Sequence, residues 1–345
     1  MFSHRNVKVH FPHIFLVNVF VCMVVASFGC GQSGDSSDTG ERTFLSVGTA
    51  PPGGAFFVVG GAIAEVVSAN VGELPWHVSA EATKGTQENI RRLDSGELDF
   101  ALANAAISYF AVRGKGAWEK EYPVRTVMTL APNIALFITP KSSGVKTLAD
   151  LKGKRVLVGP AGAGFEYFLQ PILKAHGVTY DDFTPLNNTQ AGSVDMLADG
   201  SAAAAFLGGA VPTASITQAC ASQDIHFIPF EKTAKQTLFE TYPFFFPATI
   251  SAGTYRGQDT DFDGMNVGSM HLISSAGVDE EIVYQFTKIL YEHRQEVVKT
   301  HPAGKAINPK NVIRDTGTPF HPGAIRYYKE LGIWPQESGS EPTGR

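Results

Sequence analysis

Three glycine turns carry the clearest chemical signal in the sequence. They lie in residues 45–61, 82–89 and 154–164, and each joins a short apolar strand to the start of a helix. At such a junction the first backbone N–H groups of the helix have no partner, and the helix dipole places partial positive charge there. Backbone groups arranged in this way bind anions. Together the three turns predict a small-molecule site lined by main chain.

The candidate ligand-binding residues lie in these turns or directly after a predicted strand. Hydroxyl and amide side chains would give direction to the main-chain contacts, and aromatic rings would form apolar walls. Lys84 would add a cationic contact to a carboxylate, although an exposed lysine at a loop tip is the usual alternative. The candidate set is Thr49, Gly53, Gly54, Phe56, Thr83, Lys84, Gly85, Thr86, Asn104, Gly162, Ala163, Gly164, Phe206 and Gly209.

The sequence lacks the motifs of the common enzymatic and metal chemistries. It has no Gly-x-Ser-x-Gly elbow, no His-Glu-x-x-His, no Cys-x-x-Cys and no Gly-x4-Gly-Lys-Ser/Thr phosphate loop. The histidines of the body stand in separate segments without an i, i+4 pair. A net charge of −5 with interspersed charges offers no basic face to nucleic acid. We therefore expect no catalytic residue, metal, cofactor or nucleic-acid partner.

The first part of the chain is typical of an export signal. Residues 14–26 form an apolar run after a weakly basic start, and Cys30 follows closely. The run is shorter than the ~20 apolar residues of a membrane span, which is the alternative interpretation. We predict that residues 1–30 are a lipoprotein-like signal segment, either lipidated at Cys30 or simply cleaved. Residues 31–42, rich in Gly, Ser and Asp, are predicted to be a flexible tether. Cys220 is then the one cysteine of the body, so no intrachain disulfide is expected there.

Strand and helix patterns alternate in two similar halves of the body. The first half predicts strands at 44–48, 76–80 and 99–103, with helices at 56–70 and 87–95. The second half predicts strands at 155–159, 182–186 and 202–207, with helices at 164–176 and 191–198. The repetition reaches the residues, because Thr86-Gln87 in one half corresponds to Thr189-Gln190 in the other. This alternation predicts an α/β fold of two lobes, each a mostly parallel sheet flanked by helices. Ligands of such sheets bind beyond the carboxyl ends of the strands, where the glycine turns lie.

Two apolar runs are predicted to connect the lobes. Residues 128–139, interrupted by Pro132-Asn133, read as a crossing strand with a local kink, and residues 265–275 read as a strand returning across the hinge. The predicted first lobe comprises residues 43–132 and 253–345, and the second lobe residues 133–252. A long amphipathic helix is expected at 280–299.

Four segments carry a resemblance to a known family. Residues 47–57, 81–89, 252–259 and 319–330 resemble the solute receptors of the TAXI type, the extracytoplasmic binding proteins of a class of tripartite ATP-independent periplasmic (TRAP) transporters. The resemblance implies a two-lobed periplasmic binding protein fold, type II-like or Venus-flytrap, whose lobes close on a ligand. It also implies delivery to a TRAP permease driven by an ion gradient. Ligands associated with the family are small carboxylates, such as glutamate-like and oxo-dicarboxylic acids.

The chain departs from the family pattern at positions that bear on the ligand. Phe56 and Phe57 stand where the family commonly has two tyrosines, so two hydroxyl donors are lost. Residues 83–86 read Thr-Lys-Gly-Thr where Thr-Gly-Gly-Ser is common, and Ala203 replaces a usual aspartate. Changes of this kind alter specificity, because a site built to hydrogen-bond one substrate group discriminates strongly against others.

These observations predict a receptor rather than an enzyme. We expect it to be periplasmic or extracytoplasmic, lipid-anchored to a bacterial membrane, and to pass a small carboxylate to TRAP permease subunits. The alternative interpretation is a ligand-sensing lipoprotein that regulates a membrane partner without transport.

Overall fold

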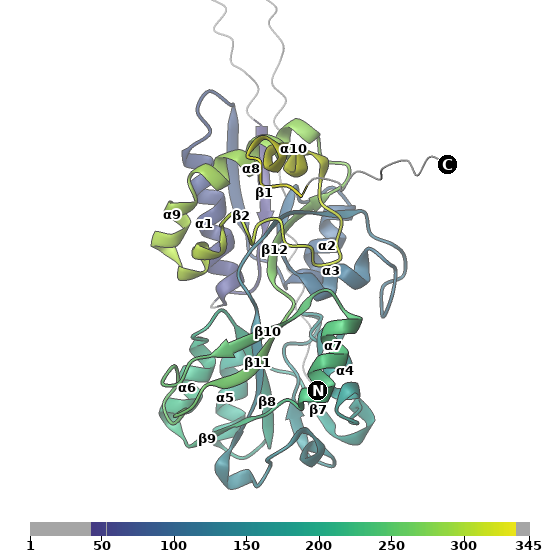
Figure 1. The fold of residues 1–345 in the computed structure, drawn as a ribbon, viewed down its shortest axis with the longest axis vertical. Coiled ribbons are helices and arrows are strands. Elements are labelled where there is room, and N and C mark those ends of the chain that lie inside the picture. The colour runs from purple at the N-terminus through teal and green to yellow at the C-terminus, as the bar shows by residue number, and fades with distance from the viewer. Residues whose placement is uncertain (1–42, 53, 336–345) are drawn as a thin grey trace, which may run out of the picture. The chain divides into compact units, whose positions relative to one another are not determined.

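The first of two mixed β-sheets contains strands from both ends of the chain (Figure 1). The computed structural model describes residues 43–52 and 54–335. The five strands of this sheet run in the order β2-β1-β3-β12-β4. Their bounds are β1 (Thr43–Gly48), β2 (Trp76–Glu81), β3 (Phe100–Asn104), β4 (Val124–Thr129) and β12 (Met270–Ser275). β1 is parallel to β2 and β3, whereas β12 is antiparallel to β3 and β4.

Helices that pack on this sheet complete the first lobe. They are α1 (Ala55–Ala69), α2 (Thr86–Asp94), α3 (Ala105–Ala111), α8 (Glu280–Glu292), α9 (Arg294–Thr300), α10 (Pro322–Glu330) and the short 3-10 helix η4 (Pro302–Ala306). The core contains residues from both parts of the chain that form this lobe. Phe100 on β3 stacks on Phe286 on α8, with ring centroids 4.0 Å apart. The predicted helix at 280–299 is in fact two helices, because His293 leaves helical geometry and ends α8.

The second sheet is continuous in sequence. Its strands run in the order β10-β11-β5-β8-β6-β7, and β9 also pairs with β5. The bounds are β5 (Ile134–Pro140), β6 (Arg155–Leu157), β7 (Thr184–Leu186), β8 (Ala204–Gly209), β9 (Ile225–Ile228), β10 (Phe245–Ile250) and β11 (Phe262–Val267). The helices are α4 (Glu166–Ala175), α5 (Gln190–Ala198), α6 (Ala214–Ser222) and α7 (Lys232–Thr241), with 3-10 helices η1 (Lys141–Ser143), η2 (Leu148–Leu151) and η3 (Tyr180–Asp182).

The sequence predicted two sheets flanked by helices, each of them mostly parallel. The two sheets are present, but both are mixed. β6 is parallel to β7 and β8, but β5 is antiparallel to β8, β9 and β11. The reason is the crossing between sheets: β5 and β12 arrive directly from the other lobe and not through a helical crossover, so they need not run parallel to their neighbours.

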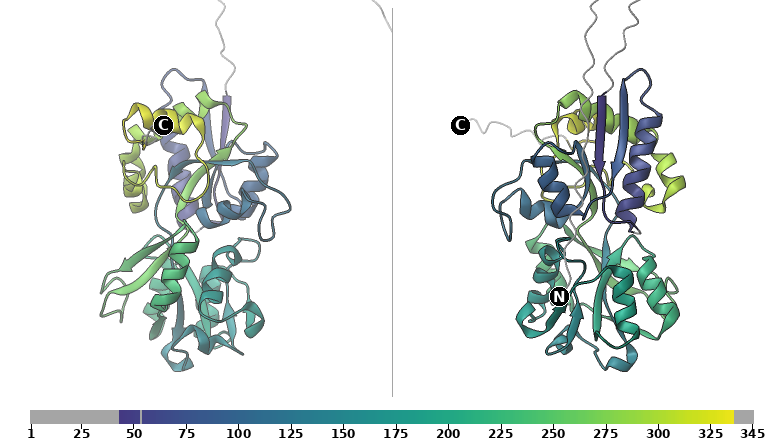
Figure 2. Two further views of the ribbon diagram at one scale, coloured as in Figure 1. Left: turned by 45° about the vertical axis from the view of Figure 1, so that its right-hand side comes forward. Right: turned by 180° about the vertical axis from the view of Figure 1, so that it is seen from behind.

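The chain crosses between the sheets at residues 130–133 and 268–269, within the two runs from which crossings were predicted. The two segments are hydrogen-bonded to each other: the Leu130 N–H donates to Met270 O at 2.8 Å, and the Met270 N–H donates to Ala131 O at 2.9 Å. We call these paired segments, residues 130–133 and 266–270, the hinge. Figure 2 shows the teal and green elements of the second sheet grouped apart from those of the first in both further views.

One predicted lobe boundary disagrees with the strand pairing. Residue 253 was expected to begin the return to the first lobe, but β11 pairs with β10 along its whole length and stays in the second sheet until Val267. The hairpin between these strands is what holds residues 253–267 there. The other lobe boundaries stay predictions.

The predicted signal segment, residues 1–30 with Cys30, and the predicted tether, residues 31–42, lie outside the described residues. Within residues 43–52 and 54–335, none of the helices has both the length and the apolar character to span a bilayer.

Candidate functional site

In each lobe the parallel strands end at one edge of the sheet. The loops that start the helices lie at that edge. In the first lobe β1, β2 and β3 each lead into a helix, α1, α2 and α3. In the second lobe the parallel strands β6, β7 and β8 lead into α4, α5 and α6. The repeat seen in the sequence therefore corresponds to two equivalent edges, each rich in unpaired N–H groups.

These two edges are in contact. The Gln87 side-chain Nε2 on α2 donates a hydrogen bond to Glu166 Oε1 on α4 at 2.8 Å. A Cβ added to Gly164 would lie 2.8 Å from Ile107 Cδ1 and 3.1 Å from Gln87 Cγ. The second and third glycine turns are thus brought together, as a site between the lobes requires.

The polar side chains of the first two turns are used to shape the loops. Thr49 Oγ1 donates to Glu81 O at 2.8 Å, and Thr83 Oγ1 donates to Thr49 O at 3.1 Å. Thr83 Oγ1 also accepts from the Gly85 N–H at 3.1 Å. Thr49 and Thr83 are only 1% and 6% exposed. Both threonines therefore position the main chain of the turn, instead of presenting free hydroxyls.

Asn104 connects the second turn to the hinge. Its backbone N–H donates to Thr86 Oγ1 at 3.0 Å, and its Nδ2 donates to Gly268 O at 2.9 Å. Its Oδ1 accepts from the Ala106 N–H and caps α3. Both the amide nitrogen and the amide oxygen of the side chain thus have a partner within the protein. In the described part of the chain the Thr86 hydroxyl accepts from Asn104 and has no acceptor for its own hydrogen, and the residue is 6% exposed.

The other predicted residues differ in their accessibility. Lys84 is exposed, and its backbone N–H donates to Glu88 Oε2 at 3.2 Å. Phe56 is half-buried against the first-lobe core, and Phe206 is 1% exposed with its ring 4.8 Å from Phe137 in the second-lobe core. Phe206 is therefore enclosed by other rings and forms no wall of a site in this structure.

The described glycines of the predicted set belong to helix-start loops. Gly54 caps α1 without a side chain, Gly85 caps α2 and Gly209 ends β8. In the third turn, exposure falls from Gly162 through Ala163 to the buried Gly164, and Gly53 lies outside the described residues.

The loop that starts α5 was missed by the sequence reasoning. Gln190 bridges it to the end of β8, because its Nε2 donates to Gly208 O at 2.8 Å and its Oε1 accepts from Ser215 Oγ at 2.9 Å. Asn187 Nδ2 donates to Gly159 O at 2.9 Å, which ties the same loop to the third turn. The repeat that matches Thr189-Gln190 to Thr86-Gln87 was the signal that could have found it.

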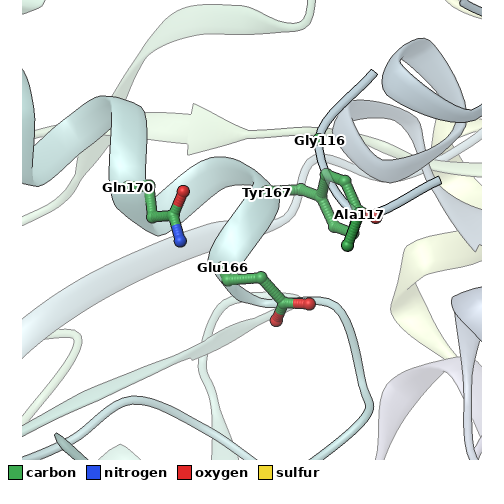
Figure 3. Close-up of a pocket in the computed structure, with 5 residues that line it drawn as sticks. All are labelled: Gly116, Ala117, Glu166, Tyr167 and Gln170. Carbon is green, nitrogen blue, oxygen red and sulfur yellow. The ribbon is translucent and has the colours of Figure 1, made fainter. Parts of the chain in front are cut away.

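A cavity of about 270 Å³ lies beside the contact between the lobes, lined by Gly116, Ala117, Glu166, Tyr167 and Gln170 (Figure 3). Tyr167 stacks on Trp118 with ring centroids 5.8 Å apart, and burial raises the pKa of Tyr167 to about 12. A second cavity of about 340 Å³ lies in the second lobe, between β9 and the loop before β11. Neither cavity is lined by a predicted ligand-binding residue. We call Gln87, Gly116 and Trp118, with Gly164, Glu166 and Tyr167 opposite them, the seam.

The described residues include two side-chain groups of a type used in nucleophilic catalysis, Cys220 and the Ser108–His271 pair, and both are buried. Among them, no group of three or more His, Cys, Asp or Glu side chains is placed to hold a metal. Cys220 is buried, and burial raises the pKa of its thiol, which makes it a poor nucleophile. Ser108 Oγ lies 2.9 Å from His271 Nε2, but both residues are fully buried within the first lobe and a substrate has no access to them.

Comparison with known proteins identifies the fold. A family model described as the NMT1-like family matches residues 47–332. PhnD1 from Prochlorococcus marinus (MIT 9301), solved in complex with methylphosphonate, superposes with a TM-score of 0.53 at 11% identity, over 85% of this chain and 97% of that chain. A protein from Bordetella bronchiseptica RB50 superposes with a TM-score of 0.51 at 15% identity, over 84% and 89% of the two chains. The architecture is that of two-lobed periplasmic binding proteins, with two mixed sheets flanked by helices.

Proposed function

The chain belongs to the NMT1-like family, and we propose that it is an extracytoplasmic solute-binding receptor that closes its two lobes on a small organic anion. The observation that carries the proposal is the contact between the two carboxyl edges, at Gln87 and Glu166. It brings helix starts from both lobes to one place, where their free N–H groups bind an anion without covalent chemistry.

The finer assignment rests on the sequence. The segments that resemble TAXI receptors support a carboxylate ligand, glutamate-like or an oxo- or dicarboxylic acid, and delivery to the membrane subunits of a TRAP transporter. The apolar run at 14–26 followed by Cys30 supports export and a lipid anchor at that cysteine. Intact-mass measurement of the protein from a bacterial membrane would test the anchor, since a diacylglyceryl adduct on Cys30 as first residue is expected.

Ligand binding can be measured before the solute is identified. A thermal-shift panel of carboxylates, sulfonates and phosphonates should contain compounds that raise the unfolding temperature by several degrees, because a ligand at 100 times its Kd stabilises by about 2.7 kcal/mol. Thr86→Ala should reduce the shift, because it removes the hydroxyl donor at the start of α2. Thr86→Ser keeps that hydroxyl and should retain the shift. A folded protein, free of co-purified ligand, that responds to no anion would contradict the proposal.

A further inference from the structure

One edge of strand β9 is left without a neighbouring strand. β9, at the lower left of Figure 1, pairs with β5 alone, in an antiparallel ladder without a register shift. The Lys141 N–H donates to Asp224 O at 2.9 Å, and this bond sets the alternation along the ladder. Counting from it, His226 directs its N–H and C=O to β5, whereas Ile225 and Phe227 direct theirs away. We call these outward N–H and C=O groups the β9 edge, with which no strand of residues 43–52 and 54–335 pairs.

The second cavity lies beside the β9 edge. Ile225 and Phe227 line it on one side, and residues 257–262 line it on the other. The Phe262 ring lies 6.0 Å from the Phe227 ring, so the far wall of the cavity packs against β9 itself. An open strand edge is ordinarily kept from pairing by its short length or by nearby charges. At β9 a wall already stands opposite the edge, so a segment added there would be enclosed on two sides.

One side chain that lines this cavity carries an acceptor without a donor. Gln258 is 6% exposed, and its Nε2 donates to Ile250 O at 2.9 Å and to Thr260 O at 3.1 Å. These two bonds fix which end of the amide carries the oxygen. Gln258 Oε1 is buried and accepts no hydrogen bond within the described part of the chain. A buried acceptor without a donor is unfavourable, so an N–H group brought into the cavity would stabilise it.

The charges around the cavity indicate which side chain it would accept. Its charged lining residues are Asp259, Asp261 and Lys141, all of them exposed. With His226 neutral, two Asp and one Lys give the lining a net charge of −1. One oxygen of Asp261 accepts from the Ala252 N–H at 2.9 Å, so this carboxylate is held at the rim. Two carboxylates together with a buried amide oxygen are complementary to a basic side chain.

We propose that the β9 edge and its cavity bind an extended segment of a partner protein, which adds a strand to β9 and directs a lysine or arginine side chain to Gln258 and Asp259. In strand addition, main-chain hydrogen bonds supply the affinity and a pocket for side chains supplies the specificity. The second lobe has both parts, the outward groups of the edge and the acceptor-rich cavity beside it. The inference goes beyond the proposed function, because β9 pairs with the half of β5 that lies far from the hinge.

Titration calorimetry with two short peptides tests the choice of side chain. The probe is acetyl-Thr-Val-Lys-Val-Thr-amide, and the same peptide with Glu at its centre is the charge control. We expect the Lys peptide to bind the purified protein at least fivefold more tightly than the Glu peptide. Asp259→Asn should shrink that ratio by threefold or more. Asp195→Asn is the matched control, because Asp195 is exposed on α5 and does not line the cavity, and it should leave the ratio unchanged. Equal effects of the two variants would overturn the assignment of a basic side chain.

Amide hydrogen exchange, followed by NMR, tests the strand addition itself. The bound Lys peptide should slow exchange of the outward Ile225 and Phe227 amides tenfold or more. The His226 and Ile228 amides are the internal control, because they are already bonded to β5 and should not change.

The remaining outcomes count against the inference. Binding of the Lys peptide without slower exchange at Ile225 and Phe227 would overturn strand addition, and failure of both peptides to bind at millimolar concentration would overturn the site. If the two amides already exchanged slowly in the free protein, and became fast when residues 336–345 were removed, the occupant would be this chain's own C-terminal segment and not a partner. Each of these results leaves the receptor proposal standing, because closure of the lobes on an anion does not involve β9.

Discussion

The two lobes meet at the hinge, at the seam and where Tyr109 and Phe110 of α3 pack on Tyr242 and Phe244. The hinge and the seam are built from different chemistry. At the hinge, main chain pairs with main chain, and Leu130 and Met270 are 1% and 2% exposed. At the seam, side chains meet: the Gln87–Glu166 hydrogen bond is only partly buried, and Trp118 stacks on Tyr167. Hinge hydrogen bonds survive most side-chain substitutions, whereas seam contacts depend on particular residues.

This difference indicates which contact breaks on opening. Opening at the seam breaks a side-chain hydrogen bond worth about 1 kcal/mol and exposes the Trp118 and Tyr167 rings, which are 5% and 6% exposed, whereas the main chain of the hinge stays paired. Asn104 lies between the two, because it bonds both to Thr86, which precedes Gln87 of the seam, and to Gly268 of the hinge. Substitutions at the hinge should therefore affect the stability of the fold, and substitutions at the seam should affect the position of the lobes.

The largest effect is expected at Gly268. Its φ of +113° is strained for other residues, and an added Cβ would lie 2.3 Å from Asn104 Oδ1 and 2.8 Å from the Ala106 nitrogen. Gly268→Ala should therefore lower the free energy of unfolding by about 3 kcal/mol in urea titrations. Gly253→Ala is the control, because Gly253 also has a positive φ but an added Cβ meets nothing within 4 Å. It should cost about 1 kcal/mol, and equal losses for the two variants would contradict the packing argument.

An intermediate effect is expected from His271, which lies on β12 directly after the hinge. It is fully buried between Ser108 and Thr126, and burial lowers its pKa from 6.5 to about 3. Because the folded pKa is below the unfolded value, the unfolded chain binds one more proton between these two pH values. The stabilisation is complete above pH 6.5 and is lost as the pH falls towards about 3.

The pH slope gives the measurement. One proton corresponds to about 1.4 kcal/mol per pH unit, so His271 should account for a loss of about 2 kcal/mol between pH 6.5 and about pH 5. Burial also lowers the pKa values of His176, His301 and His321, which add to the slope in any variant that keeps them. His271→Gln should flatten the dependence of the unfolding free energy on pH by up to one proton. Parallel slopes for wild type and variant would rule out this role.

Local patterns in the sequence were sufficient to predict most of the helices and strands. The strand predicted at 44–48 is β1 at Thr43–Gly48, and the kink at Pro132-Asn133 falls between β4 and β5. Glycine turns and alternating apolar residues are local signals, so they predict an element whichever strand it later pairs with. The antiparallel pairing of β5 with β8, β9 and β11 was not predicted, because pairing joins residues far apart in sequence.

The same limit applies to the site. The sequence placed Thr49, Thr83 and Asn104 at the helix-start loops, but not the atoms to which they bond. Asn104 contacts Gly268, 164 residues away, and Gln87 contacts Glu166, 79 residues away. Whether a polar side chain faces a ligand or a backbone carbonyl depends on such distant partners, so the loops could be predicted and the free donors could not.

The smallest change in stability is expected at the seam. A substitution there also tests most directly how the seam differs from the hinge. Gln87→Ala removes the hydrogen bond to Glu166 and should change the free energy of unfolding by about 1 kcal/mol or less. Because the hinge is untouched, the lobes of the ligand-free protein should spend more time apart, which small-angle X-ray scattering would detect as a larger radius of gyration.

Gln285→Ala provides the matched control. Gln285 Nε2 donates to Glu281 Oε1 at 2.7 Å within α8, so this variant loses the same kind of bond inside one lobe. It should leave the radius of gyration unchanged. If Gln87→Ala gave the same scattering curve as this control, the Gln87–Glu166 bond would be an incidental contact, and the hinge and the aromatic packing between the lobes would determine how far they open. A larger radius of gyration for Gln87→Ala alone would instead show that this one hydrogen bond, between residues 79 apart in sequence, contributes measurably to the equilibrium between open and closed lobes.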